Sequence, residues 1–168
     1  RGDFFILFRF KIEYCSKMSQ SSDSSNNTPV IKCESVYKIF GNNALKLLEN
    51  SNGQVDAKTF QEAGCIVGVN NASFGVKKGE MMVVMGLSGS GKSTLLRCIS
   101  RLTDATAGKI FIDGEDLLSM NSKQLIELRR NKMGMVFQSF ALLPHKTVIE
   151  NIAFPLQVKG TNTRNSMA

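Results

Sequence analysis

The sequence has 168 residues, about the length of one domain, which excludes two large independent domains within it. Hydrophobic residues make up 42% and charged residues 21%, as in ordinary globular proteins, and the longest apolar runs, Phe4–Phe8 and Met81–Met85, are far too short to cross a bilayer. The net charge of +7 points to an anionic partner: nucleic acid, a membrane surface or a phosphate-bearing ligand. The excess lies in residues 77–168 without tight Lys/Arg runs or interleaved aromatics, so we interpret it as solvated surface and expect no nucleic acid partner.

The amino-terminal segment is unlike the rest of the chain. An apolar cluster before Met18 is interrupted by charges, and residues 19–28 contain no apolar side chain, which predicts disorder. We therefore expect residues 1–28 to be a disordered or spurious leader. One alternative is that residues 1–17 are translated upstream sequence and Met18 is the true start; another is a signal peptide, which the missing small-residue cleavage site disfavours. Residues 29–168 form the expected domain.

Four cysteines are spread along the chain with no CxxC pair, and only one histidine accompanies them. This spacing predicts reduced, structural thiols in a cytosolic protein rather than a metal site. The four are Cys15, Cys33, Cys65 and Cys98.

The ordered part begins with a strand at residues 30–36 that runs on to a turn at Gly41. Residues 44–64 then change to helical spacing, with Asp56 as a cap and Gly64 as a terminator, and we interpret them as a small helical insertion. Strand patterns return at 67–69 and 72–76.

The run Met81–Met85 is uninterruptedly apolar, as expected of a central strand buried on both faces of a parallel sheet. Residues 86–93 follow it as GLSGSGKS and match the phosphate-binding pattern G-x-x-x-x-G-K-[ST], and apolar residues at helical spacing come next. Strand, glycine loop and helix therefore occur in the order that a phosphate site requires.

A triphosphate places several negative charges in a small volume, and backbone N–H groups at a helix N-terminus can bind them together. The glycines allow tight wrapping, Lys92 supplies a cation for the β and γ phosphates, Ser93 can ligate Mg²⁺, and Thr94 can contact the α phosphate. The predicted nucleotide-binding residues of the loop are Gly86, Leu87, Ser88, Gly89, Ser90, Gly91, Lys92, Ser93 and Thr94.

Downstream residues separate the classes of phosphate-loop protein. A GTPase needs N-K-x-D, and residues 131–134 (NKMG) lack the final carboxylate. Arg129 and Arg130 fall in a predicted helix capped by Asn121 or Ser122, so they do not form the arginine-rich lid of a nucleoside kinase.

A strand at 109–112 with an Asp-Gly turn comes before that helix, and an apolar strand at 133–137 follows it. This last strand delivers Gln138, 46 residues after Lys92, to a position where its amide can bind Mg²⁺ or orient water.

At these motifs the chain resembles the ATP-binding subunits of ABC transporters. The stretch GLSGSGKST resembles the Walker A loop, and GKIFIDGEDL resembles the strand and turn that follow it. The stretch MVFQSFALLPHKTVIENIAFPL resembles the Q-loop and the segment that meets the membrane subunit. VYKIFG, the helical insertion and GCIVGVNNASF are most similar to bacterial glycine betaine/proline betaine importers. The resemblance implies an α/β, P-loop NTPase core with a mixed sheet, here incomplete and truncated after the Q-loop.

The resemblance also implies roles for individual residues. Phe40 matches the aromatic that stacks on adenine, with Tyr37 as the competitor, and Gln138 matches the glutamine that senses Mg²⁺ and the γ phosphate. Thr147 and Glu150 have capping-box spacing at the start of a helix expected to receive the permease. His145 comes too early to be the family's switch histidine, so we interpret it as a loop or interface residue.

Three parts that the family needs are missing from the sequence: an LSGGQ-like signature, a strand ending in Asp-Glu, and a later histidine. No catalytic residue is therefore assigned, and the isolated chain is expected to bind ATP weakly without turning it over at a family-like rate. The expected partners are a transmembrane permease, a second ATPase subunit arranged head to tail and, indirectly, a substrate-binding protein, at the cytoplasmic face of a bacterial inner membrane. The alternatives are a non-transport ABC ATPase of DNA repair or translation, an importer of another substrate such as an amino acid, and an inert nucleotide-binding fragment.

Overall fold

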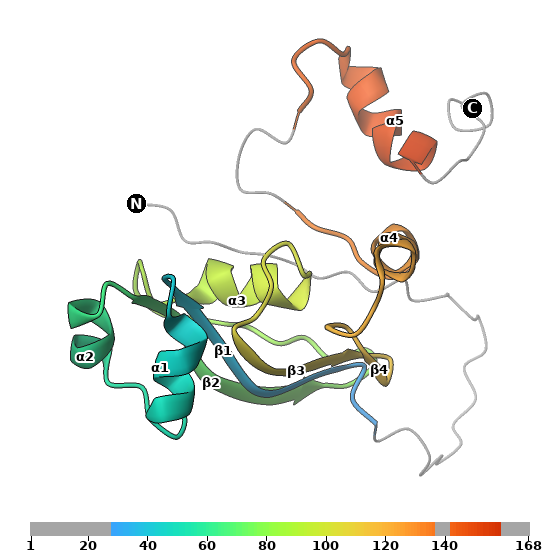
Figure 1. Ribbon diagram of the computed structural model, residues 1–168. Helices are drawn as coiled ribbons and strands as arrows, with labels where there is room; N and C mark the ends of the chain where they lie inside the picture. Colours follow the sequence, from blue (N-terminus) through green and yellow to red (C-terminus); the bar gives the residue numbers. More distant parts are fainter. Residues whose placement is uncertain (1–27, 137–141, 159–168) are drawn as a thin grey trace. The chain divides into compact units, whose positions relative to one another are not determined.

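The computed structural model describes residues 28–136 and 142–158 (Figure 1). These residues fall into two compact units, which divide between Met120 and Asn121. Almost all of the leader predicted at 1–28 lies outside the described residues.

The first unit is built on a four-stranded sheet. Its strands follow the order β2-β1-β3-β4, and every neighbouring pair is antiparallel. The sequence predicted a mixed sheet, and for the described residues this prediction is wrong because the sheet is antiparallel throughout. The strands are β1 (Ile31–Phe40), β2 (Ile66–Val76), β3 (Ala107–Ile112) and β4 (Glu115–Asp116).

A tight turn joins β3 to β4 and confirms the Asp-Gly signal. Ile112 pairs with Glu115, so only Asp113 and Gly114 form the loop, and their φ angles are 51° and 82°. A two-residue hairpin turn with positive φ at both positions favours Asp-Gly, since glycine carries no Cβ and aspartate tolerates the left-handed region.

A bulge in β1 changes which side chains face which side of the sheet. Cys33 pairs with Phe74 and Val36 with Ala72, so two residues of β1 lie opposite one residue of β2. Ser35, one of those two residues, has a φ of 45°. The extra residue shifts the alternation, so Val36, Lys38 and Phe40 share one face while Tyr37 and Ile39 share the other. Gly108 on β3 accommodates the bulge, because a Cβ there would overlap the Ser35 carbonyl oxygen.

The helical insertion covers the Tyr37 and Ile39 face. It consists of α1 (Ala44–Asn50) and α2 (Ala57–Glu62), and Asp56 caps α2 by accepting a hydrogen bond of 3.0 Å from the Thr59 N–H. The predicted insertion and its cap are thus confirmed. The insertion and the strand share one hydrophobic cluster: Tyr37, Ile39, Ala44, Leu48, Phe60 and Cys65.

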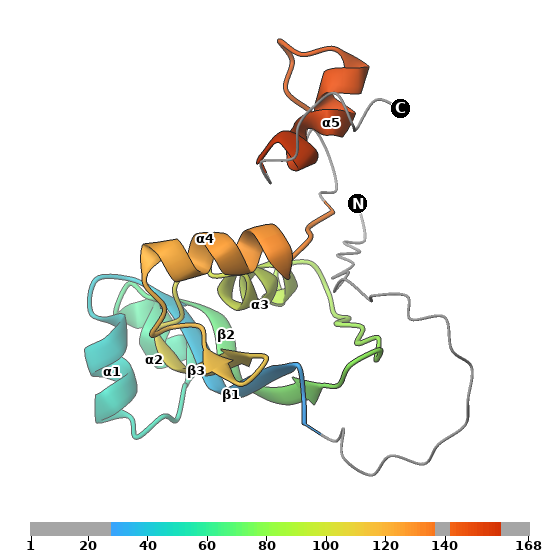
Figure 2. The same cartoon turned by 90° about the vertical axis from the view of Figure 1, so that its right-hand side faces the viewer.

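The helix that follows the glycine loop packs on the sheet. This helix, α3 (Lys92–Ile99), buries Leu95, Cys98 and Ile99 and contacts both β1 and β2. Figures 1 and 2 show it lying over one face of the sheet. The α3 helix is therefore packed against the strand pair β1–β2.

The strand predicted at Met81–Met85 is not formed. Those residues have no regular secondary structure, and the side chains of Met81 and Met85 are 76% and 86% exposed. A buried strand needs neighbours to accept its backbone hydrogen bonds, and no described segment pairs with this run. Apolar composition alone was therefore not sufficient to make it a core strand.

The described part of the second unit contains two helices, α4 (Ser122–Asn131) and α5 (Val148–Val158). Asn121 caps α4 in a full capping box with Gln124, which confirms one of the two predicted caps. The strand expected at 133–137 is absent from its described part, residues 133–136. Within residues 28–136 and 142–158, no helix combines the length and apolar character needed to cross a membrane.

Candidate functional site

The glycine loop joins residue 85 to α3 and depends on two left-handed glycines. Gly89 and Gly91 have φ angles of 81° and 88°, which side chains rarely adopt. Gly91 is also the N-cap of α3, and no side chain caps this helix. The first-turn N–H groups of an α-helix have no acceptor within the helix, so those of residues 92–94 are left for an anion.

Gly91 must also be a glycine for a second reason. A Cβ at this position would overlap the carbonyl oxygen of Gly68 on β2. The loop and the sheet therefore touch backbone to backbone, and this contact sets the position of the start of α3.

Lys92 is held at the mouth of the loop by the loop's own backbone. Its Nζ donates hydrogen bonds to the carbonyl oxygens of Gly86 at 2.6 Å and Leu87 at 2.7 Å, and a longer one to the Ser90 hydroxyl at 3.4 Å. These three bonds use all three N–H donors of the ammonium group, and a phosphate oxygen would replace the longest and weakest of them first. The backbone of the loop thus positions the cation.

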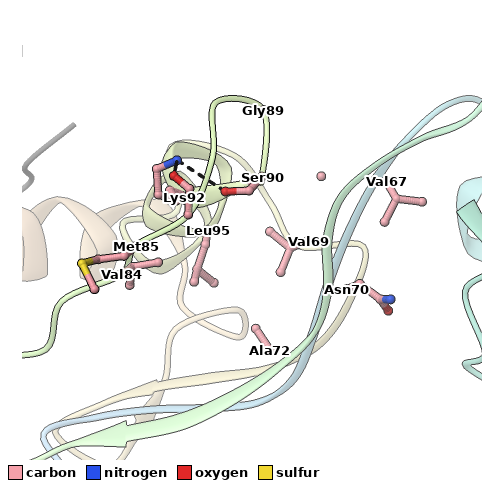
Figure 3. Close-up of a pocket in the computed structure, with 13 residues that line it drawn as sticks. Val67, Val69, Asn70, Ala72, Val84, Met85, Gly89, Ser90, Lys92 and Leu95 are labelled. Atoms are coloured by element: carbon pink, nitrogen blue, oxygen red, sulfur yellow. Dashed lines mark hydrogen bonds between the residues drawn. The ribbon is translucent and has the colours of Figure 1, made fainter. Parts of the chain in front are cut away.

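A cavity of about 440 Å³ lies between the loop and β2. Figure 3 shows Val69 and Ala72 of β2 on one side, with Leu95, Val84 and the loop on the other. The cavity therefore combines apolar walls with the Lys92 ammonium, both drawn from the first unit.

The two competing aromatic residues of β1 have different surroundings. Tyr37 is only 8% exposed, and its hydroxyl donates a 3.1 Å hydrogen bond to the Gly53 carbonyl inside the insertion. Phe40 is 44% exposed, and Lys38 Nζ lies 5.0 Å from its ring centroid. Phe40 is therefore the ring available to a ligand, whereas Tyr37 belongs to the core.

Phe40 also lies near the glycine loop. A Cβ built on Gly68 would be 2.9 Å from Phe40 Cε2 and 3.0 Å from Thr94 Cγ2, so the ring and the first turn of α3 meet over the same point of β2. The structure thus brings Phe40 together with the loop residues 86–94 in one unit.

Two residues were expected to ligate Mg²⁺. Ser93 lies in the first turn of α3, directly after Lys92, where a hydroxyl beside a phosphate cradle suits this hard, oxygen-seeking cation. Gln138 lies outside the described residues. Ser93 is therefore the one proposed metal ligand whose position the structure gives.

The segment before α5 is organised by side chains. The predicted capping box is confirmed, since the Thr147 N–H donates to Glu150 Oε2 at 2.7 Å and the Glu150 N–H to the Thr147 hydroxyl at 3.4 Å. The hydrogen bonds from Thr147 lower the pKa of Glu150. The side-chain amide of Asn151 also makes two hydrogen bonds to the backbone of Leu143: its oxygen accepts from the Leu143 N–H, and its NH₂ group donates to the Leu143 carbonyl. His145 is an exposed residue of this loop, in agreement with its interpretation.

Three of the cysteines are buried free thiols, as predicted: Cys33, Cys65 and Cys98. Burial, and to a smaller extent the neighbouring Cys98, raises the pKa of Cys33 to about 12, which leaves it protonated and unreactive.

The family model for the ABC transporter matches residues 69–168, more than half of the chain. The chain belongs to the ABC transporter family. It is 81% identical over 139 residues to the "Trimethylamine N-oxide transport system ATP-binding protein TmoW" of Pelagibacter ubique, which covers 83% of this chain and 41% of the relative. It is 43% identical over 135 residues to the "Glycine betaine/proline betaine transport system ATP-binding protein ProV" of Escherichia coli, covering 79% of this chain and 33% of the relative.

Solved ABC structures share the fold. A dimeric, post-hydrolysis structure of the ATP-binding cassette MJ0796 bound to ADP and Pi matches with a TM-score of 0.60 and 32% identity, over 77% of this chain and 47% of that chain. The ABC ATPase cassette fold predicted from the sequence is therefore confirmed. The chain spans less than half the length of the relatives named above.

The sequence pattern assigned no role to Gly68, although this residue lies within the family-like stretch GCIVGVNNASF. Its carbonyl oxygen lies against Gly91, and a Cβ on it would crowd Phe40 and Thr94. An isolated glycine within a strand pattern indicates a bulge or a close backbone approach, and that signal was present at this position.

Proposed function

We propose that this chain forms the nucleotide-binding part of an ABC importer subunit that binds Mg-ATP. The proposal depends above all on Lys92, whose ammonium is already oriented by Gly86 and Leu87 at the entrance of a glycine loop. The uncapped start of α3 adds N–H donors and a positive dipole end at the same place.

The proposed ligand is bound in two halves. Residues 86–94 hold the phosphates, and Phe40 offers an exposed ring on which adenine stacks. Ser93, with Gln138 from the later segment, would hold Mg²⁺, and the ion would supply positive charge to neutralise the phosphates.

The proposed transported solute is a small methylated amine. The sequence alone favoured glycine betaine or proline betaine, but the 81% identity is to a trimethylamine N-oxide transport protein, against 43% for the betaine protein of E. coli. Trimethylamine N-oxide and glycine betaine share a trimethylated, positively charged nitrogen and an anionic oxygen. We therefore place trimethylamine N-oxide first and glycine betaine second.

The proposed assembly contains two copies of the ATPase subunit, a transmembrane permease and a substrate-binding protein, at the cytoplasmic face of the inner membrane. The dimeric MJ0796 structure supports the pairing of ATPase subunits. ATP then acts by stabilising a closed dimer over an open one and so biases the permease between two states.

Uptake by the reconstituted transporter tests the proposal. The full-length subunit is assembled with its permease and binding protein in liposomes that enclose Mg-ATP, and uptake of labelled trimethylamine N-oxide and glycine betaine is measured. We expect uptake that Lys92→Ala abolishes, with a preference for trimethylamine N-oxide. A preference for glycine betaine would correct the solute, whereas uptake that does not depend on ATP would reject the function.

A further inference from the structure

Gly68 lies at the point of β2 where three parts of the proposed nucleotide site meet. A Cβ on Gly68 would lie 2.9 Å from Phe40 Cε2, 3.0 Å from Thr94 Cγ2 and 3.3 Å from the Lys38 carbonyl oxygen. Contacts this short require at least one neighbour to move. The space at residue 68 is therefore already filled by the ring and by the first turn of α3.

The carbonyl group of Gly68 contacts the other half of the site. Its oxygen occupies the place that a side chain on Gly91 would need, so the backbone of β2 lies directly against the N-cap of α3. Gly68 thus lies against the phosphate loop and leaves room for the ring that is proposed to stack on the base.

We propose that Gly68 is a positioning residue of the nucleotide site: its missing side chain sets the distance between the Phe40 ring and the phosphate loop. This inference rests on the proposed ATP binding. A nucleotide has a nearly fixed distance between base and phosphates, so a displaced ring loses stacking while the phosphates stay bound.

Lys38 holds the ring from a second direction. Its Nζ lies 5.0 Å from the Phe40 centroid, on the same face of β1, which is within the range of a cation–π contact. With Lys38 over the ring and Gly68 at its edge, Phe40 has a restricted orientation despite being 44% exposed. A larger residue at 68 therefore displaces the ring towards solvent.

The test is made on the full-length subunit with Gly68→Val, Gly68→Ala and the control Gly75→Ala. Gly75 is on the same strand, and the nearest neighbours of a Cβ there would be Pro29 and the Ile31 carbonyl oxygen. Affinities for ATP and for inorganic triphosphate are measured by calorimetry. We expect Gly68→Val to weaken ATP binding about tenfold, the order of a lost base–aromatic stack, with triphosphate affinity unchanged and with Gly68→Ala in between.

A double-mutant cycle separates positioning from general damage. If Gly68 acts through the ring, Gly68→Val has little further effect on ATP affinity once Phe40→Ala has removed that ring. Because a side chain at residue 68 crowds its neighbours, the unfolding temperature of each variant is measured as well, and affinities are compared at a temperature at which all the variants are folded.

Three results would count against the inference. Equal losses of affinity for ATP and triphosphate in Gly68→Val would show that residue 68 acts on the loop. Additive losses of ATP affinity in the double-mutant cycle would show that it does not act through Phe40. An unchanged ATP affinity would show that residue 68 has no positioning role. Wild-type protein that binds no ATP would instead reject the proposed function, so the two failures are distinguishable.

Discussion

The two faces of β1 differ: one face packs in the hydrophobic core, and the other faces the glycine loop. Tyr37 and Ile39 lie under the helical insertion and are at most 8% exposed. Lys38 and Phe40 alternate with them and lie on the side of the glycine loop, where Phe40 keeps nearly half of its surface exposed. One strand therefore contributes to the hydrophobic core with one face and to the proposed nucleotide site with the other.

The bulge at Ser35 makes this division possible. Without the extra residue, the alternation set by Ile31 and Cys33 would bring Tyr37 to the loop side and Phe40 to the insertion side. Changes on the core face should therefore alter stability with little effect on ligand affinity, and changes on the loop face should do the reverse.

The largest expected effect is on the core face, from Phe60→Ala. Phe60 is 2% exposed and packs in the cluster with Tyr37 and Leu48, so its removal should lower the free energy of unfolding by about 3–5 kcal/mol. Urea unfolding of the subunit measures this. Leu45→Ala, at a position 49% exposed on α1, is the matched control and should cost well under 1 kcal/mol. Equal losses would mean that the insertion does not contribute a packed core.

The next effect is on the loop face, from Lys92→Ala. Losing the oriented ammonium removes charge-assisted hydrogen bonds to phosphate, and ATP affinity should fall about 100-fold. The unfolding temperature should stay close to that of wild type because the ammonium bonds to groups of the exposed loop and Lys92 is not among the buried core residues. Lys78→Ala removes the same charge from an exposed turn and should leave the affinity within about twofold. ATP titration followed by fluorescence distinguishes the two variants.

A smaller loss is expected for Phe40→Ala, about tenfold in ATP affinity, the usual order for one base–aromatic stack. Inorganic triphosphate should bind this variant as it binds wild type, because the loop is intact. Phe40→Tyr keeps a ring of the same width and should restore most of the affinity. If Phe40→Ala weakens ATP and triphosphate alike, the ring supports the loop and does not stack on the base.

Local signals predicted much of this arrangement. The glycine loop, the Asp56, Asn121 and Thr147 caps and the Asp-Gly turn each depend on hydrogen bonds or φ angles of adjacent residues, so a short stretch of sequence is sufficient to indicate them. The fold family was indicated by the resemblance of these stretches to the ATP-binding subunits of ABC transporters. Contacts between distant segments were not predicted: the pair Gly68–Gly91 joins residues whose closeness depends on how α3 packs on β2.

The error at Met81–Met85 has the same origin. An apolar run indicates that burial would be favourable, but burial of a strand also requires a ladder partner, which no pattern within the run specifies. The bulge at Ser35 was missed because serine is not a typical left-handed residue and its conformation is matched by Gly108 on another strand.

The smallest expected effect tests whether the faces of β1 are independent. Tyr37→Phe removes only the hydroxyl that donates to the Gly53 carbonyl, and the free energy of unfolding should fall by about 1 kcal/mol, a typical net value for one hydrogen bond. ATP affinity should not change, because the ring stays in the cluster and Lys38 and Phe40 keep their places on the opposite face. Unfolding and ATP titration on the same preparation measure both quantities. A loss of ATP affinity without a loss of stability would show that the insertion transmits its state through β1 to the nucleotide site, and the core face would then have to be counted as part of that site.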